Sequence, residues 1–190
     1  MVKEILTGWI RPIIALFVFA RYKTIWALKE KLRTSQKRHR LLESVYWGYF
    51  AKRGSYIGIN ARLATQPCFP HGVIGVFISD NAVIGRDAVI FQQVTIGSNQ
   101  LSDSDGQGSP VLGDNVYIGA GAKIIGGVTL GDRCRIGANA VVYKDLPSDS
   151  VAVCASTRII QKKDLDNRYT TQIGEVTYRF SDGRMKKVDK

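Results

Sequence analysis

The stretch VLGDNVYIGAGAKIIGGVTLGDRCRIGANAVV, residues 111–142, repeats one pattern every six residues. Aliphatic residues stand at positions 112, 118, 124, 130, 136 and 142, and glycine directly follows four of these six. Upstream, the same spacing separates Ile78, Ile84, Ile90 and Ile96. An α-helix repeats near 3.6 residues and a half-buried strand repeats every two, so neither of these elements explains the period.

A period of six that holds over ten units predicts a coil with flat faces. A short strand turns its aliphatic residue inward, and three such units close one triangular coil. No coil can bury its apolar face alone, so the stability comes from stacking one coil on the next. A second series of small or medium apolar residues, four positions after each aliphatic one, is also expected to point inward, and Cys134 belongs to it.

One unit of the repeat is longer than the others. Ile96 and Leu112 are sixteen residues apart, so this unit carries ten extra residues. The excess is polar and rich in turn formers, which predicts a loop over residues 98–110 that leaves the coil. Loops that leave a rigid scaffold often carry function.

The ends of the chain differ in charge from the repeat. Residues 1–53 hold twelve lysines and arginines against three acidic residues, whereas residues 54–154 hold six against eight. We expect a basic, apolar-rich helical segment over 1–54, which Pro12 divides into two helices. The repeat domain is expected over 55–162. A C-terminal extension over 163–190 should contain a hairpin around Asp182–Gly183.

Two interpretations of the basic segment remain open. Apolar residues beside clustered lysines and arginines favour peripheral contact of residues 1–40 with a membrane surface. Alternatively, the apolar residues pack on the repeat domain or between subunits. The apolar run 13–20 is too short to cross a bilayer, which takes about 20 residues, and lacks a cleavage pattern. We therefore expect a cytoplasmic protein that binds no nucleic acid, with the inner face of the cytoplasmic membrane as the alternative location.

The three cysteines do not indicate a metal site. Their spacing lacks any C-x-x-C pattern, and the chain has only two histidines. We expect reduced thiols and no metal. Cys68 precedes His71 by three residues, so a Cys/His nucleophile pair is a further possibility, although nothing in the sequence marks this thiol as activated.

The run VIFQQVTIGSN, the coil IGAGAKIIG and the coil end VVYKDLP resemble the hexapeptide-repeat acyltransferases, within them the serine-acetyltransferase-like group. The resemblance covers about residues 55–162. It implies an all-β fold, a left-handed parallel β-helix, with a short helical N-terminal segment. It also implies homotrimers with active sites between subunits, and acetyl-CoA as co-substrate in the groove between neighbouring coils.

The resemblance singles out His71, because PHGVIG corresponds to the DH-x-x-G segment that the catalytic histidine opens in the serine enzymes. A neutral imidazole can remove the proton from an acceptor hydroxyl as it attacks the thioester. The plainer alternative is a turn histidine with a satisfied hydrogen bond. His39 lies among basic residues, where a solvated position is expected.

The departures from the family pattern concern the acceptor. Pro70 stands where the family has an aspartate, and Gly108 and Ser109 stand where it has an arginine and a histidine. Tyr56 occupies the position of the aspartate that orients the family histidine. Tyr56, Asn60 and Ser109 are candidate substrate-binding residues. The candidate partners of His71 are Tyr56, Asn60, a backbone carbonyl or a group from another subunit of the trimer.

The resemblance also implies the residues that would hold acetyl-CoA. Backbone and wall contacts, the loop beside the thioester and the phosphate-binding residues are assigned to Gln92, Gly97, Ser98, Asn99, Ala120, Ala138, Lys144 and Arg158.

The sequence thus predicts an acetyl-CoA-dependent O-acetyltransferase. Because the residues that hold serine are replaced, a sugar hydroxyl of a surface polysaccharide or its precursor is the expected acceptor. A serine O-acetyltransferase of cysteine biosynthesis is the first alternative. A trimeric β-helix without catalytic activity, serving as a scaffold, is the second.

Overall fold

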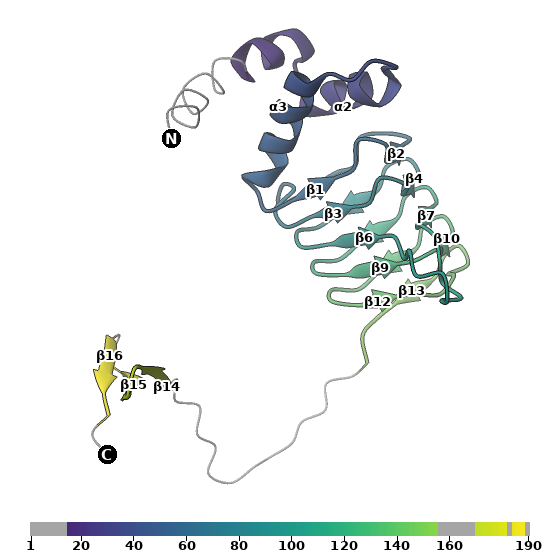
Figure 1. Ribbon diagram of the computed structural model, residues 1–190. Coiled ribbons are helices and arrows are strands. Elements are labelled where there is room, and N and C mark those ends of the chain that lie inside the picture. Colours follow the sequence, from purple (N-terminus) through teal and green to yellow (C-terminus); the bar gives the residue numbers. More distant parts are fainter. Residues whose placement is uncertain (1–14, 156–169, 182–183, 189–190) are drawn as a thin grey trace. The chain divides into compact units, whose positions relative to one another are not determined.

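The computed structural model describes residues 15–155, 170–181 and 184–188. Its contacts divide the chain into two units, Met1–Ala155 and Ser156–Lys190. The first unit holds a helical cap and a stack of β-coils, and the second holds a small sheet (Figure 1).

The coils form a left-handed parallel β-helix, an all-β fold with three flat faces (Figure 1). Face A stacks β1 (Tyr56–Ile57), β3 (Phe77–Ile78), β6 (Thr95–Gly97), β9 (Lys123–Ile125) and β12 (Val141–Val142). Face B stacks β2 (Arg62–Leu63), β4 (Val83–Ile84), β7 (Val111–Leu112) and β10 (Thr129–Leu130). Face C stacks β5 (Val89–Ile90), β8 (Tyr117–Ile118), β11 (Arg135–Ile136) and β13 (Val151–Ala152).

The core is a set of ladders in register. On face A, Ile78 pairs with Ile96, Ile96 with Ile124, and Ile124 with Val142. All ten aliphatic residues of the six-residue period are at most 5% exposed, which confirms that they point inward. The second inward series is buried as well, and Cys134 is fully buried within it.

The β-helix begins one coil earlier than the unbroken period suggests. Residue Ile57 pairs with Ile78 and Leu63 pairs with Ile84, an offset of 21 residues where a regular coil has 18. The inward residues Ile57, Leu63 and Phe69 are six apart, so the three extra residues lie between Phe69 and Ile78. This break hides the first coil from a search for the period, and it contains His71.

The helical cap consists of a helical stretch over residues 15–22, α2 (Ile25–Thr34) and α3 (Arg40–Ala51). The Thr24 side chain begins α2 by accepting a hydrogen bond from the Ala27 amide. Pro12, where a division into two helices was predicted, lies outside the described residues. The breaks within the described part fall at residues 23–24 and 35–39. No helix among the described residues has the length and apolarity needed to cross a membrane.

The cap closes the open end of the β-helix. The Lys29 side chain of α2 is 1% exposed, and its ammonium donates hydrogen bonds to the carbonyls of Ile59 and Ala61 in the first coil. From α3, the Tyr46 hydroxyl donates to the Ile57 carbonyl at 2.7 Å. These donors satisfy carbonyls that no earlier coil could pair, since the ladder begins here. Burial lowers the pKa of Lys29 below its ordinary value.

The second unit contains β14 (Thr170–Ile173), β15 (Val176–Ser181) and β16 (Arg184–Lys187) in one antiparallel sheet. The pairing of β15 with β16 confirms the predicted hairpin, although its turn residues 182–183 lie outside the described part. The strand β14 was not predicted. It pairs with β15 across Gly174, which adopts a φ of +61° that suits a tight turn.

Replacing Lys29 tests whether the cap closes the β-helix in this way. We expect Lys29→Ala to lower the free energy of unfolding by about 2–4 kcal/mol, because one buried and one partly buried carbonyl lose their donor. Lys31→Ala, two positions further on the exposed side of the same helix, should change it by about 0.5 kcal/mol or less. Urea unfolding monitored by circular dichroism compares the two, and equal losses would contradict this role for Lys29.

Candidate active site

The predicted site residues lie on two edges of the prism. The C–A edge is where the chain passes from face C to face A, at residues 70–76, 91–94, 119–122 and 137–140. The A–B edge is where it passes from face A to face B, at residues 58–61, 79–82, 97–110, 126–128 and 143–145. Side chains on different edges of one chain are separated by the width of face A.

His71 lies exposed on the C–A edge, in the corner that carries the three extra residues. The backbone of this corner is tied down on both sides of the histidine. The Gly72 amide donates to the Phe69 carbonyl at 3.0 Å, and the Gly75 amide donates to the Arg53 carbonyl at 3.1 Å. The His71 ring also meets the ring of Phe91 edge to face, with centroids 5.3 Å apart.

The hydrogen-bond partner of His71 is Gln92, one coil further along the same edge. The His71 Nδ1 atom lies 2.8 Å from Gln92 Oε1. An amide oxygen only accepts, so Nδ1 carries the hydrogen and Nε2 keeps a free lone pair in the neutral ring. The Gln92 backbone is fixed in turn, because its carbonyl accepts a hydrogen bond from the Gly121 amide at 3.0 Å. The side-chain amide of Gln92 therefore holds the His71 ring in one tautomer without adding charge.

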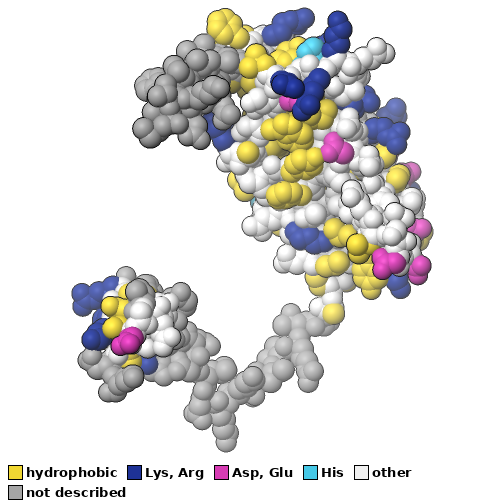
Figure 2. All heavy atoms as spheres, in the orientation of Figure 1, with side chains coloured by type: hydrophobic (Ala, Val, Ile, Leu, Met, Phe, Trp, Pro, Cys, Tyr) yellow, Lys and Arg dark blue, Asp and Glu magenta, His cyan; other side chains and the backbone are white. Residues whose placement is uncertain are grey.

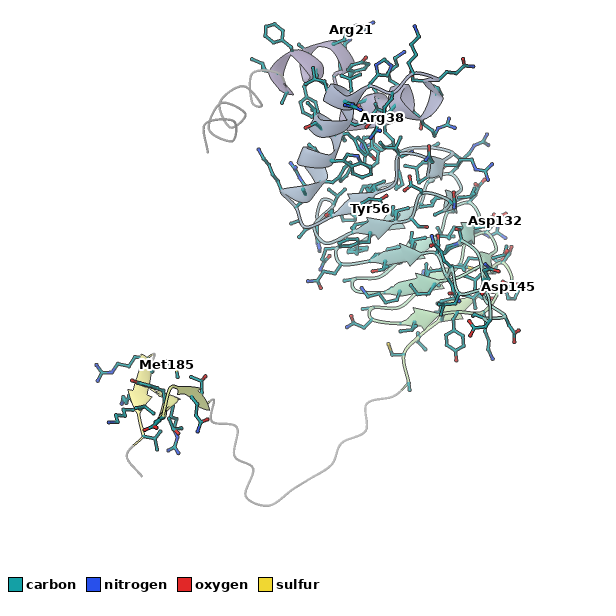
Figure 3. All side chains as sticks on the ribbon, in the orientation of Figure 1. Arg21, Arg38, Tyr56, Asp132, Asp145 and Met185 are labelled. Atoms are coloured by element: carbon teal, nitrogen blue, oxygen red, sulfur yellow. The ribbon has the colours of Figure 1, made fainter. Side chains whose placement is uncertain are left out.

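Tyr56 and Asn60, the predicted partners of His71, contact Asp80 instead. The Tyr56 hydroxyl donates to Asp80 Oδ2 at 2.5 Å, and the Asn60 amide donates to Asp80 Oδ1 at 3.1 Å. Burial, followed by the hydrogen bond to Asp80, raises the pKa of Tyr56 to about 12. The Tyr56 ring stacks on Trp47 of α3 at 4.9 Å, which orients it beneath the cap (Figure 3). These residues form a structural cluster around the first turn of the A–B edge.

Two of the residues assigned to acetyl-CoA continue the C–A edge below Gln92. The Ala120 carbonyl accepts a hydrogen bond from the Asn139 amide at 2.8 Å, and the Ala138 carbonyl lies 3.4 Å from the thiol of Cys154. Gly121 adopts a φ of +72° at the corner, where a side chain would overlap that of Asn139. His71, Gln92, Ala120 and Ala138 thus follow one another along one edge.

Three other assigned residues, Gly97, Ser98 and Asn99, lie on the A–B edge at the base of the loop. The Ser98 and Ser109 hydroxyls are 2.7 Å apart. Asn99 exchanges two backbone hydrogen bonds with Gly108, both at 2.9 Å, and its side chain donates to the Ser104 hydroxyl. The Gly97 carbonyl accepts from the Gly126 amide, and the Gly106 carbonyl accepts from the Gly127 amide at 3.0 Å, so the loop lies against the next coil. Lys144 is exposed at the end of this edge, and Arg158 lies outside the described residues.

Two side chains that contact His71, those of Gln92 and Phe91, were not predicted as its neighbours from the sequence. Gln92 was assigned to the cofactor groove and not to His71, because 21 residues separate them and the three-residue excess obscures their stacking. Phe91 is not among the predicted site residues. The inward series Ile57, Leu63, Phe69 is the signal that could have revealed the first coil and hence this stacking.

The arrangement can perform base chemistry at Nε2 of His71. In the part of the chain that the structure describes, no carboxylate makes a hydrogen bond or ion pair with this ring. Cys68 is exposed, and its backbone pairs with Val89 on face C. No group of three or more candidate metal ligands occurs among the described residues.

Residues 109–144 match the family model described as bacterial transferase hexapeptide (six repeats). A serine acetyltransferase of Helicobacter pylori is 46% identical over 109 residues, which make up 57% of this chain and 62% of that protein. A serine acetyltransferase of Synechococcus elongatus is 38% identical over 109 residues, 57% of this chain and 43% of that protein. The chain thus spans less than two thirds of either relative.

The solved structures that are similar to this chain include serine acetyltransferases as well. Serine acetyltransferase isoform 3 of Entamoeba histolytica, in complex with cysteine, gives a TM-score of 0.61 at 26% identity, covering 74% of this chain and 50% of that one. The soybean serine acetyltransferase complexed with serine gives 0.56 at 32% identity, covering 70% and 53%. This chain therefore carries the bacterial transferase hexapeptide repeat, and serine acetyltransferases are similar to it in both sequence and fold.

Proposed function

We propose that this protein is an acetyl-CoA-dependent O-acetyltransferase with His71 as its general base. The observation that carries the proposal is the 2.8 Å contact between His71 Nδ1 and Gln92 Oε1, which leaves Nε2 free on an exposed edge. The similarity to serine acetyltransferases supports acetyl transfer as the reaction class.

In the proposed reaction, Nε2 takes the proton of the acceptor hydroxyl as the hydroxyl oxygen attacks the thioester carbonyl. The carbon–sulfur bond then breaks, the acetyl group stays on the acceptor oxygen, and the proton passes to the thiolate of CoA. Backbone amides at the edges can stabilise the negative charge that develops on the carbonyl oxygen. The reaction needs no metal for proton or charge balance.

We further propose that the site is completed by a second copy of the chain in a homotrimer. His71, Gln92, Ala120 and Ala138 follow the C–A edge, whereas Gly97, Ser98, Asn99, Ser109 and Lys144 follow the A–B edge. Face A separates the two sets within one chain. Packing the C–A edge of one subunit beside the A–B edge of the next would bring them to one groove, where acetyl-CoA would lie.

The relatives favour serine as the acceptor, since both sequence relatives described above are serine acetyltransferases. One observation favours the second candidate, a sugar hydroxyl of a surface polysaccharide or its precursor. Pro70 precedes His71, and Gly108 and Ser109 belong to the loop, so these positions offer no charged group for the amino and carboxylate groups of serine. The comparisons lend no support of their own to a polysaccharide acceptor.

Variants of Gln92 and His71 test the proposed base. His71→Ala should lower kcat about 100-fold or more, because no other group takes the proton. Gln92→Leu should lower kcat about tenfold without moving the pH profile, since the ring loses its orientation but meets no new charge. Gln92→Glu should move the acidic limb of the kcat profile upward by about one pH unit, because a carboxylate favours the protonated ring.

The profiles are measured as thiol release from acetyl-CoA between pH 5 and 9, a range chosen about the ordinary histidine pKa of roughly 6.5. Gln66→Glu makes the same amide-to-carboxylate change at an exposed position on the third edge, between faces B and C. It serves as the matched control and should leave the acidic limb in place. Full activity of His71→Ala would contradict the mechanism. An unmoved acidic limb in Gln92→Glu would contradict the pairing.

An acceptor panel separates the two candidates. Thiol release is compared for serine, nucleotide sugars and oligosaccharides at equal concentration, with His71→Ala as the blank. If the acceptor is serine, we expect its kcat/KM to exceed that of every sugar by at least about 100-fold, because a site that hydrogen-bonds the polar groups of its substrate rejects molecules that lack them. A sugar that exceeds serine would favour the second candidate. If no acceptor is turned over and acetyl-CoA does not bind, the result would favour a β-helix without catalytic activity that serves as a scaffold.

A further inference from the structure

We propose that one face of the helical cap binds the surface of an anionic lipid bilayer. The face is formed by Leu16, Phe17, Ala20, Arg21 and Lys23, and we call it the cap strip. It lies at the end of the first unit that is remote from β12 and β13 (Figures 1 and 3, which label the strands and Arg21). The proposal concerns where the protein works and is independent of its catalytic activity.

The cap strip exposes large apolar side chains that nothing in the described structure covers. The helical stretch 15–22 buries Val18 and half-buries Phe19 and Tyr22, and the Phe19 ring contacts that of Tyr49 in α3 at 6.0 Å. On its other side, Leu16 and Phe17 are each 71% exposed. Exposing two neighbouring large apolar residues costs free energy in water and is typical of a surface that meets an apolar phase.

Basic residues continue the strip directly from the apolar pair. Arg21 follows Phe17 by one helical turn, and Lys23 ends the stretch with a φ of +62° that turns the chain into α2. Both side chains are exposed. An apolar pair beside a basic rim on one helix face is the pattern of helices that lie in the plane of a membrane surface.

The charge of the first unit is divided between its parts. The described cap, residues 15–54, holds ten lysines and arginines against two glutamates, a balance of +8. The coils, residues 55–155, hold six against eight, a balance of −2. Figure 2 shows lysine and arginine side chains gathered over the cap. An anionic surface would therefore attract the cap and repel the coils, which orients the unit with the cap strip toward the lipid.

Acidic side chains on the coils favour the same orientation, because an anionic surface repels them. Asp114 and Asp132 lie one above the other on the edge between faces B and C, where each accepts a hydrogen bond from a backbone amide of the preceding coil. Ser148 continues this column by accepting a hydrogen bond from the Asp132 amide, and its neighbour Asp149 pairs with Arg133 at 2.6 Å. Backbone amides hold the carboxylates of Asp114 and Asp132 in place, so the repulsion does not depend on mobile side chains.

An anionic polymer such as nucleic acid would account for the charge alone. Phosphate contacts need lysine and arginine but do not need Leu16 and Phe17 exposed side by side. The apolar pair is thus the observation that selects a lipid surface, and it is also the feature that the experiment must alter separately from the charge.

Vesicle flotation with the full chain tests the proposal. Wild-type protein should float with vesicles of equal parts phosphatidylglycerol and phosphatidylcholine, and it should stay behind with vesicles of phosphatidylcholine alone. The double variant Leu16→Ser/Phe17→Ser should lower the bound fraction about tenfold, because the apolar contact is lost. The double variant Arg21→Glu/Lys23→Glu should do the same by removing the attraction.

Matched controls carry the same types of change away from the cap. Val153→Ser, at a side chain 72% exposed, and Arg135→Glu, on face C, should float like the wild type. Each variant must keep the thermal unfolding midpoint of the wild type, and Phe17→Ser alone replaces the double variant if that one does not.

Three outcomes would overturn the proposal. The wild type could fail to float with the anionic vesicles, or the two controls could lose binding as strongly as the cap variants. The third is that Leu16→Ser/Phe17→Ser floats like the wild type whereas Arg21→Glu/Lys23→Glu does not, which would mean that charge alone mediates binding, as for an anionic polymer.

Discussion

The structure depends on the in-register stacking of aliphatic side chains inside the prism. Ile78, Ile96, Ile124 and Val142 lie in one ladder, and each strand contributes only two or three residues. Strands this short have no stability of their own, so the burial of each inward residue against its equivalents one coil above and below must hold the coil. An insertion or deletion within a strand would shift every inward residue that follows it out of register with the neighbouring coils.

This constraint decides where functional residues can stand. Extra residues are tolerated only at the edges, and the chain has two insertions there. The loop 98–110 leaves the A–B edge, and the three-residue excess between Phe69 and Ile78 leaves the C–A edge. The second insertion carries His71 and brings it over Gln92 of the next coil. Stacking that stabilises the fold thereby also supplies the partner of the candidate base.

The partner of His71 has a chemical consequence. A carboxylate in this place would stabilise the imidazolium ion. The neutral side-chain amide of Gln92 fixes the tautomer but adds no negative charge to offset that of the protonated ring. Asp80, the carboxylate that contacts the predicted orienting residues, accepts hydrogen bonds from Tyr56 and from the Asn60 amide on another edge. The proposed acetyl transfer would therefore rely on orientation of the ring more than on electrostatic support of its protonated form.

The sequence by itself determined the coil, because a period of six is visible wherever the length stays constant from one unit to the next. It determined the inward residues and the loop for the same reason, whereas His71 was singled out by the resemblance to the hexapeptide-repeat acyltransferases. Only the tertiary structure decided the partner of His71, the 21-residue offset of the first coil and the closure of the open end of the β-helix by Lys29. Each of these depends on contacts across coils or between the cap and the first coil. Neither an irregular offset of 21 residues nor a helix outside the repeat follows the period of six, so a search for that period cannot find them.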